Sequence, residues 1–320
     1  MEPPLPTADV EAPADAPPPI AKPRQRIPVV TLLACAACIS VFIGLSLEDD
    51  TRNWATLSKW GFFSANRIRE GAYWGLITSA FVHLEIWHVA FNVYWLYLLG
   101  IRLEREIGSL RWLALVLSSA LVSSAAEVTF AGTTGIGASG VVYALFGFMW
   151  VTRRRFPSFQ SALDQRTIIL FFAWLVGCLF LTLSHTWNVG NAAHFAGLLF
   201  GAGCGAWLIY QPRRSLIATA VSVVAVSSFV GLFWAPWSGE WASWRGYRAY
   251  LKGDFKSAIH WYQKGLELGE DKVWSWQNLA YSYYALGEAG HYKYALEFVR
   301  GLDENVAKQI ESELANNKKK

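Results

Sequence analysis

Seven long apolar runs dominate the sequence and limit its fold to a bundle of membrane-spanning helices. They lie near residues 28–47, 81–100, 112–130, 138–152, 168–185, 192–210 and 215–235. A helix needs about 20 mostly apolar residues to cross ~30 Å of hydrocarbon, where the backbone must also satisfy its own hydrogen bonds. Hydrophobic residues make up 53% of the 320 residues and charged residues only 16%, a balance too apolar for a soluble chain. We therefore predict an all-α polytopic membrane protein.

Basic residues in alternate loops predict the orientation of this bundle. Loops rich in Lys and Arg remain on the cytoplasmic side of a membrane. The residues concerned are Lys22, Arg24, Arg26, Arg102, Arg105, Arg111, Arg153, Arg154, Arg155, Arg166, Arg213 and Arg214. We expect a cytoplasmic N-terminus with a disordered, Pro-rich tail at residues 1–27, and everything after Trp237 outside. The first run is long and lacks a small-residue cleavage pattern after it, so no signal peptide is expected.

Neither the charge nor the cysteines indicate a further ligand. The formal net charge of +4 follows largely from the basic loops and the terminal lysines, so no nucleic-acid partner is expected. Cys35 and Cys38 form a C-x-x-C inside the first apolar run, where a redox thiol would lack access to water. We expect both to be packing residues, and the sequence indicates no cofactor.

The stretch TTGIGASGVVYALFG, at the start of the fourth run, fits two unrelated chemistries. Gly135, Gly137 and Gly140 have the G-x-G-x-x-G spacing of a dinucleotide-binding turn. That turn needs a preceding β-strand and an acidic residue about 20 positions later, whereas this stretch lies between apolar runs and is followed by Arg153–Arg155. The context excludes the nucleotide site and leaves Ser139 as a candidate nucleophile, which would need a base.

His194 is the candidate base, because an ionisable side chain inside an apolar span is costly and indicates function. On a helix it would share one face with Gly197, Gly201 and Gly205. That face has almost no side-chain bulk, so it is predicted to pack closely on small residues of the fourth run, namely Gly140, Ala144 and Gly147. The packing would bring Ser139 and His194 together as nucleophile and general base.

His88 and Asn92, four residues apart in HVAFN, are candidate donors to an oxyanion. Both would project from one face of the second helix, and with the backbone N–H of Ser139 they could form an oxyanion hole. No Asp or Glu occurs inside the fourth or sixth run, so a Ser-His dyad is expected rather than a triad. The nearby HLEIWH lacks the H-E-x-x-H spacing of zinc proteases, and the spans lack the paired Asp of an aspartyl protease, so no metal site is expected.

Taken together, HVAFN, GASG and AHFAG resemble the motifs of the rhomboid family of intramembrane serine proteases, in the family's order on the second, fourth and sixth spans. The resemblance extends over about Trp60–Tyr210. It implies that Ser139 is the nucleophile and His194 the base, with His88, Asn92 and the Ser139 amide as oxyanion donors. The motifs also imply supporting positions: Gly137, Gly140, Tyr143, which would pack on the base, and Gly197.

The resemblance further implies a six-helix core around a water-filled cavity that opens outward in a bacterial inner membrane. Substrates of the family are single-span membrane proteins whose helix unwinds near the outer surface. The expected domains are this core at 28–212, a seventh span at 213–237 and a soluble helical segment at 238–320.

One departure is Gly75 after Trp74, where the family usually has Arg, which would affect loop anchoring but no catalytic group. A non-catalytic protein of the same fold that recruits clients through the soluble segment is the alternative.

The pattern of the soluble segment predicts repeated helix-turn-helix units, and the segment resembles tetratricopeptide repeats. Ala258 and Tyr262 fit the second helix of one unit. The first helix of the next unit is matched by Trp276, Leu279, Ala280 and Tyr283, with an irregular insertion expected at GEAGH. About two repeats are marginal for an independent solenoid. The segment is therefore expected to dock on the membrane domain, bind a protein partner or self-associate, although packing between helices alone also explains its aromatic residues.

Overall fold

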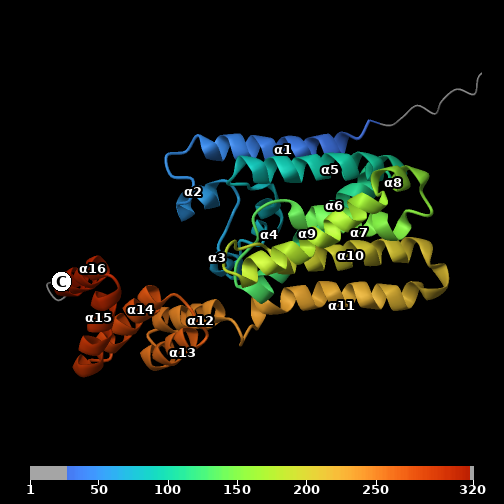
Figure 1. The fold of residues 1–320 in the computed structure, drawn as a ribbon. Helices are drawn as coiled ribbons and strands as arrows, with labels where there is room; N and C mark the ends of the chain where they lie inside the picture. The colour runs from blue at the N-terminus through green and yellow to red at the C-terminus, as the bar shows by residue number, and fades with distance from the viewer. Residues whose placement is uncertain (1–26, 318–320) are drawn as a thin grey trace, which may run out of the picture.

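The computed structural model describes residues 27–317, and this part of the chain is helical with no β-strand. The predicted disordered tail at residues 1–27 lies outside the described residues apart from its last position. Seven helices correspond to the predicted spans: α1 (Val29–Ser46), α5 (Ile86–Ile107), α6 (Ser109–Ala131), α7 (Ser139–Thr152), α9 (Gln165–Leu183), α10 (Asn191–Ile209) and α11 (Arg214–Phe233). Among them α1, α5, α10 and α11 lie along roughly the same axis (Figure 1).

Not all seven helices are long enough to cross a bilayer unaided. Five helices within the described range have the length and apolarity for a full crossing, namely α1, α6, α9, α10 and α11, the last counted together with η2 (Gln211–Arg213). A sixth crossing results if α5 is joined to the preceding α4 (Gly75–Thr78) and η1 (Ser79–Phe81), from which it is bent by 101°. The chain is thus an all-α, multi-pass membrane protein.

The second span differs from the predicted residues 81–100. The chain leaves η1 at Val82 in an extended conformation and turns before α5 begins at Ile86. At its other end α5 continues to Ile107 through a polar segment that hydropathy alone would place outside the membrane helix. The extension is possible because Glu104 is buried and accepts the amide N–H groups of Val30 and Thr31, at 3.1 and 2.8 Å.

The short helix α7 is buried along most of its length, and α10 packs directly against it. A Cβ atom added to Gly197 would collide with the carbonyl oxygen of Gly140, and one on Gly201 would collide with that of Ala144. The close approach predicted from the glycine spacing is therefore present. This contact fixes the position of α10 along the axis of α7, because each glycine of α10 leaves space for a backbone carbonyl of α7.

The helix α7 is too short to cross the membrane by itself. Its 14 residues span about 21 Å at 1.5 Å per residue, whereas the hydrocarbon layer is ~30 Å thick. Irregular backbone such as the α6–α7 connection (132–138) is tolerated at membrane depth only inside protein or beside a water-filled space.

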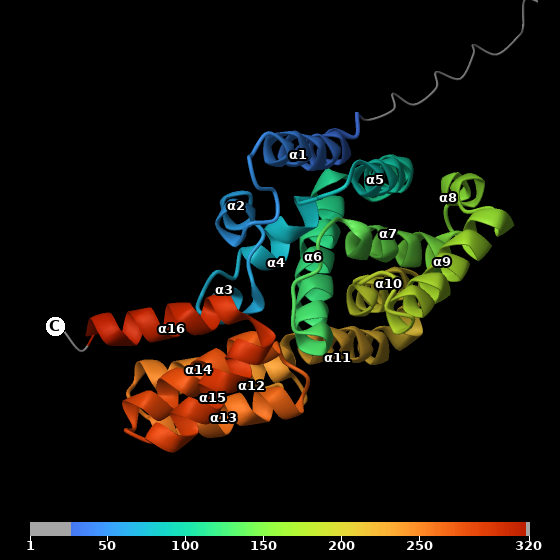
Figure 2. The same ribbon diagram turned by 60° about the vertical axis from the view of Figure 1, so that its left-hand side comes forward.

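The C-terminal helices lie at the end of the bundle opposite the start of α1 (Figures 1 and 2). They are α12 (Gly239–Leu251), α13 (Phe255–Glu267), α14 (Lys272–Ala285), α15 (Ala289–Leu302) and α16 (Glu304–Asn317). Ala258 and Tyr262 on α13 are fully buried against Leu279 and Ala280 on α14. Where an insertion was expected around GEAGH, the chain makes a short turn at 286–288, and α15 already begins at Ala289. The tetratricopeptide-like assignment stays a prediction.

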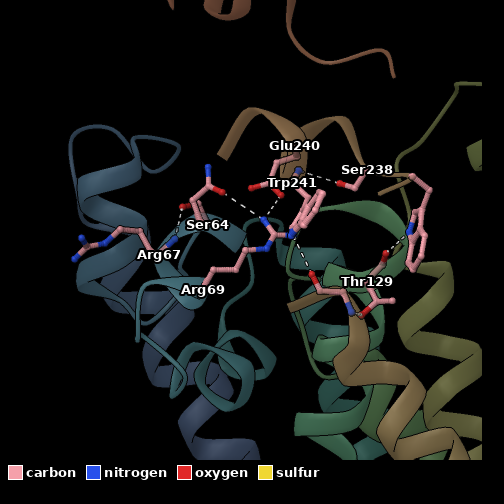
Figure 3. Close-up of polar contacts among 10 residues, drawn as sticks. Ser64, Arg67, Arg69, Thr129, Ser238, Glu240 and Trp241 are labelled. Carbon is pink, nitrogen blue, oxygen red and sulfur yellow. Dashed lines mark hydrogen bonds and ion pairs between the residues drawn. The ribbon is translucent and has the colours of Figure 1, made fainter. Parts of the chain in front are cut away.

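A buried ion pair connects the C-terminal helices to the membrane domain (Figure 3). The guanidinium of Arg69, on the short helix α3 (Ala65–Arg69), pairs with the carboxylate of Glu240 at the start of α12. Arg69 also donates to the carbonyl of Gly231 at the end of α11, at 3.4 Å. The Trp237 indole N–H donates to the carbonyl of Thr129 on α6, at 2.9 Å. Burial raises the pKa of Glu240, although the Arg69 guanidinium acts in the opposite direction.

Two further short helices complete the described chain. They are α2 (Trp54–Lys59), which follows α1, and α8 (Pro157–Ala162), which lies between α7 and α9. Each has a local start signal in the sequence: Asn53 caps α2 by accepting the amide of Ala55 at 2.8 Å, and Pro157 occupies the first position of α8.

Candidate active site

Ser139 is the first residue of α7, directly after the α6–α7 connection. Gly137 makes this possible, because its φ of +96° is accessible mainly to glycine. A Cβ there would also lie only 2.7 Å from the His88 ring. The amide of Gly137 donates to the carbonyl of Ser79 at 3.1 Å, which ties the turn to η1. The first amides of a helix have no acceptor within the helix, so the Ser139 N–H points toward the space before α7.

His194 lies in the first turn of α10, is 3% exposed, and its Nε2 is 2.8 Å from Ser139 Oγ. This is hydrogen-bonding distance for a nucleophile and its base. The ring packs on Tyr143, one turn along α7 from Ser139, with centroids 4.8 Å apart. The Tyr143 hydroxyl donates to the carbonyl of Phe171 at 3.0 Å, which holds that ring in place. Residues 55 positions apart in the sequence are thus joined in one pair.

His88 and Asn92 project from the first half of α5 and border the same cavity as Ser139. The His88 ring lies against Gly137, immediately before the α7 start. One N–H of the Asn92 side chain donates to the carbonyl of His88 at 3.1 Å, and the side-chain amide has a second N–H to donate. Their part as oxyanion donors stays a prediction.

A cavity of about 650 Å³ surrounds the Ser139–His194 pair. It is lined by residues of α5, α6, α7, α9 and the α9–α10 connection, and both sequence-predicted donors border it. Over it, Trp87 of α5 stacks on Trp187 of the α9–α10 connection, with centroids 4.9 Å apart and planes inclined by 2°. The site is a concave, mostly apolar pocket with a few convergent polar groups.

Two residues near the pair are absent from the sequence-based prediction of the site. His83 is fully buried with its ring 5.0 Å from that of His88. Glu127 of α6 is 4% exposed, lines the cavity, and accepts the amide of Ala193 at 2.9 Å. A signal for Glu127 exists in the sequence, since a carboxylate inside an apolar span is costly, but it lies in the third run, outside the two runs that carry Ser139 and His194.

The remaining predictions concern metals and the first loop. Within residues 27–317 no three His, Cys, Asp or Glu side chains are grouped as a metal site would require. Gly75 is buried, and a Cβ there would meet Phe63 at 2.9 Å. An arginine at this position would therefore have to displace Phe63. The neighbouring helix α3 is attached to the start of α12 through the ion pair of Arg69 with Glu240.

Comparison with known proteins agrees with the fold. A profile of the Rhomboid domain matches residues 70–211. Three relatives, each named Rhomboid protease GlpG, come from Salmonella paratyphi A (strain ATCC 9150 / SARB42), Salmonella newport (strain SL254) and Salmonella heidelberg (strain SL476). Each is 32% identical over 178 residues, covering 56% of this chain and 62% of the relative. The chain thus spans somewhat less than two thirds of their length. Residues 70–211 thus match the Rhomboid domain, and the chain is similar over 56% of its length to relatives named as rhomboid proteases.

Proposed function

We propose that this protein is an intramembrane serine endopeptidase in which Ser139 is the nucleophile and His194 the general base. The observation that carries the proposal is the 2.8 Å contact between Ser139 Oγ and His194 Nε2 inside a cavity within the membrane domain. The relatives named as rhomboid proteases support the same reaction class. They do not favour the alternative of a non-catalytic protein that recruits clients.

In the first half of the reaction, Ser139 Oγ forms a bond to the scissile carbonyl carbon while its proton passes to His194 Nε2. The carbonyl π electrons move to the oxygen, and the resulting oxyanion is stabilised by the Ser139 amide and side-chain N–H groups of His88 and Asn92. When the C–N bond breaks, His194 returns the proton to the leaving nitrogen. A water molecule, activated by His194, then hydrolyses the serine ester and restores the hydroxyl.

The depth of the site points to a peptide bond near one membrane surface. Because α7 is about 9 Å shorter than the ~30 Å hydrocarbon layer, a substrate helix would have to unwind over its last turns to present an accessible carbonyl. Single-span membrane proteins are the proposed substrates. The distribution of basic loops supports a cytoplasmic N-terminus, and with it an outer position for the cavity mouth and the segment 238–320. We propose on the same grounds that residues 28–212 are the protease domain and 213–237 an additional span.

The proposal is tested by fluorophosphonate labelling of the purified protein in detergent. We expect the wild type to be labelled at Ser139, and the Ser139→Ala and His194→Ala variants to be unlabelled while retaining their helical circular dichroism. Labelling that persists in a folded His194→Ala variant would remove the histidine from the mechanism. A folded wild type that is not labelled would leave the binding protein as the better account.

A further inference from the structure

Glu127 is a buried carboxylate that the proposed dyad does not use, although it lies beside the dyad. It projects from α6 into the junction of the α6–α7 and α9–α10 connections. A Cβ on Gly190 would lie 3.5 Å from its carboxylate, and one on Gly135 would lie 3.6 Å from its Cγ. Both are ordinary van der Waals distances, so the Glu127 side chain lies in contact with both connections.

The carboxylate bonds to the first turn of α10. It accepts the amide of Ala193 at 2.9 Å and also interacts with that of Ala192. These are the second and third amides of a helix whose own cap residue, Gly190, has no side chain to offer them. The first amides of a helix lack acceptors within the helix, and an acidic group near them is stabilising because of the helix dipole. Glu127 thus caps α10 from a neighbouring helix.

His194 follows Ala193 directly, so the capped turn carries the base. Its Nδ1, the ring atom that an acidic residue holds in a catalytic triad, has no hydrogen-bond partner within the described chain. The ring is steadied on one side by Tyr143. Two hydrogen bonds hold the backbone around His194. The amide of Ala193 donates to the Glu127 carboxylate, and the amide of His194 donates to the carbonyl of Gly190 at 3.1 Å.

We propose that Glu127 is a positioning residue: it fixes the first turn of α10, and through it places His194 Nε2 opposite Ser139 Oγ. This inference rests on the proposed function, since it concerns the geometry of the same dyad. Glu127 replaces the missing third member of a triad without touching the imidazole, because it orients the histidine through the backbone. A displacement of about 1 Å at a reacting group is enough to lower a rate ~100-fold.

The chain contains a matched control in Glu104. This carboxylate is 2% exposed, lies on α5, and accepts the amides of Val30 and Thr31 in the first turn of α1. Like Glu127, Glu104 is a buried carboxylate on one helix that satisfies N-terminal amides of another, and it also accepts the hydroxyls of Thr31 at 2.7 Å and Ser109 at 2.6 Å. It differs in that α1 carries no residue of the dyad. A purely structural role predicts equal consequences for the two sites, whereas a positioning role predicts different ones.

The experiment measures saturation kinetics of fluorophosphonate labelling for the full chain in detergent, together with thermal unfolding. Binding of the probe gives KI, and bond formation gives kinact. We expect Glu127→Ala to lower kinact about 10- to 100-fold with KI within about twofold. Glu127→Gln keeps an acceptor but not the charge, so we expect it to recover to within about fivefold of the wild type. Glu104→Ala should lower the unfolding temperature and leave kinact of the folded protein within about twofold.

Two results would overturn the inference: a folded Glu127→Ala protein with wild-type kinact, or an equal loss of kinact in Glu104→Ala. If Glu127→Ala does not fold, Glu127→Met, which fills the space but accepts no amide N–H, decides: a loss of kinact at unchanged KI supports the inference, and a wild-type kinact overturns it. Failure of the proposed function is distinguishable, because it appears as absent labelling of the wild type or as labelling that survives in Ser139→Ala.

Discussion

At the scale of single residues, the candidate site depends on side chains that hold the His194 ring from several directions. Tyr143 covers one face, and its hydroxyl is itself fixed by the carbonyl of Phe171. Tyr143 is 3% exposed, so the ring contributes both apolar burial and a satisfied polar group. The two contributions are separable by substitution.

We expect Tyr143→Phe to lose about 1 kcal/mol of stability, because the hydrogen bond from the Tyr143 hydroxyl to the carbonyl of Phe171 is lost, and to label with fluorophosphonate within about threefold of the wild-type rate. Tyr143→Ala removes the ring that supports His194, and should lower the rate about tenfold and cost about 3 kcal/mol or more. Thermal unfolding and labelling kinetics in detergent measure both quantities. A folded Tyr143→Ala protein that labels at the wild-type rate would show that the ring does not steady the base.

At the scale of helices, the contact between α7 and α10 is a backbone-to-backbone packing that admits no side chain. The carbonyl oxygens of Gly140 and Ala144 occupy the space where Cβ atoms of Gly197 and Gly201 would be. In a bilayer, where lipid is as apolar as the helices, close van der Waals packing of this kind is a main source of association. Any added atom must separate the helices that carry the dyad.

We expect Gly197→Ala to destabilise the protein by about 1–3 kcal/mol, since overpacking of a tight contact forces the backbone to move, and to reduce labelling of Ser139. The matched control is Gly177 on α9, where nothing lies within 4 Å of an added Cβ. Gly177→Ala should be neutral or slightly stabilising, because alanine favours the helix. Unfolding in detergent compares the two, and equal effects would contradict the close-packing account.

At the scale of the whole molecule, the C-terminal helices are attached to the membrane domain through a small polar junction. Arg69 has no exposed side-chain surface and its partner Glu240 is 23% exposed, so the pair lies largely out of water. Removing one member of a buried pair leaves an uncompensated charge. The contact joins residues 171 positions apart and connects α3 with the start of α12.

We expect Arg69→Ala to cost about 3 kcal/mol and to increase proteolytic cleavage in the α11–α12 connection. The control is Arg67 on the same helix, whose side chain is 67% exposed and pairs with Glu70 at the surface. Arg67→Ala should change stability by less than about 0.5 kcal/mol. Limited proteolysis of the protein in detergent compares them, and equal susceptibility would mean that the buried pair does not hold the junction.

The same junction should depend on pH through Glu240. Because burial raises its pKa in the folded state, its contribution to stability is complete below the ordinary glutamate pKa and is lost as the pH rises through the raised value. We expect proteolysis of the α11–α12 connection to increase over that pH window in the wild type. Glu240→Gln carries no titrating group and should flatten the dependence relative to the wild type; an identical profile would assign it to other groups.

Much of this protein was predictable from the sequence, because the relevant patterns are local. Hydropathy over about 20 residues locates the spans, and the glycine spacing on one helix face predicts the close contact of α7 with α10. The motifs around Ser139 and His194 indicated which residues meet. Each of these inferences needs only the period of a helix and the cost of polar groups in lipid.

The tertiary structure alone decided three features. The continuation of α5 to Ile107 is accompanied by the bonding of Glu104 to α1, 73 residues away. Glu127 reaches the first turn of α10 across 66 residues, and Arg69 meets Glu240 across a still longer separation. A charged residue inside an apolar run indicates that it needs a partner. Which backbone amide or side chain is that partner depends on how the helices pack. The helical repeat of the sequence carries no information about which partner is chosen.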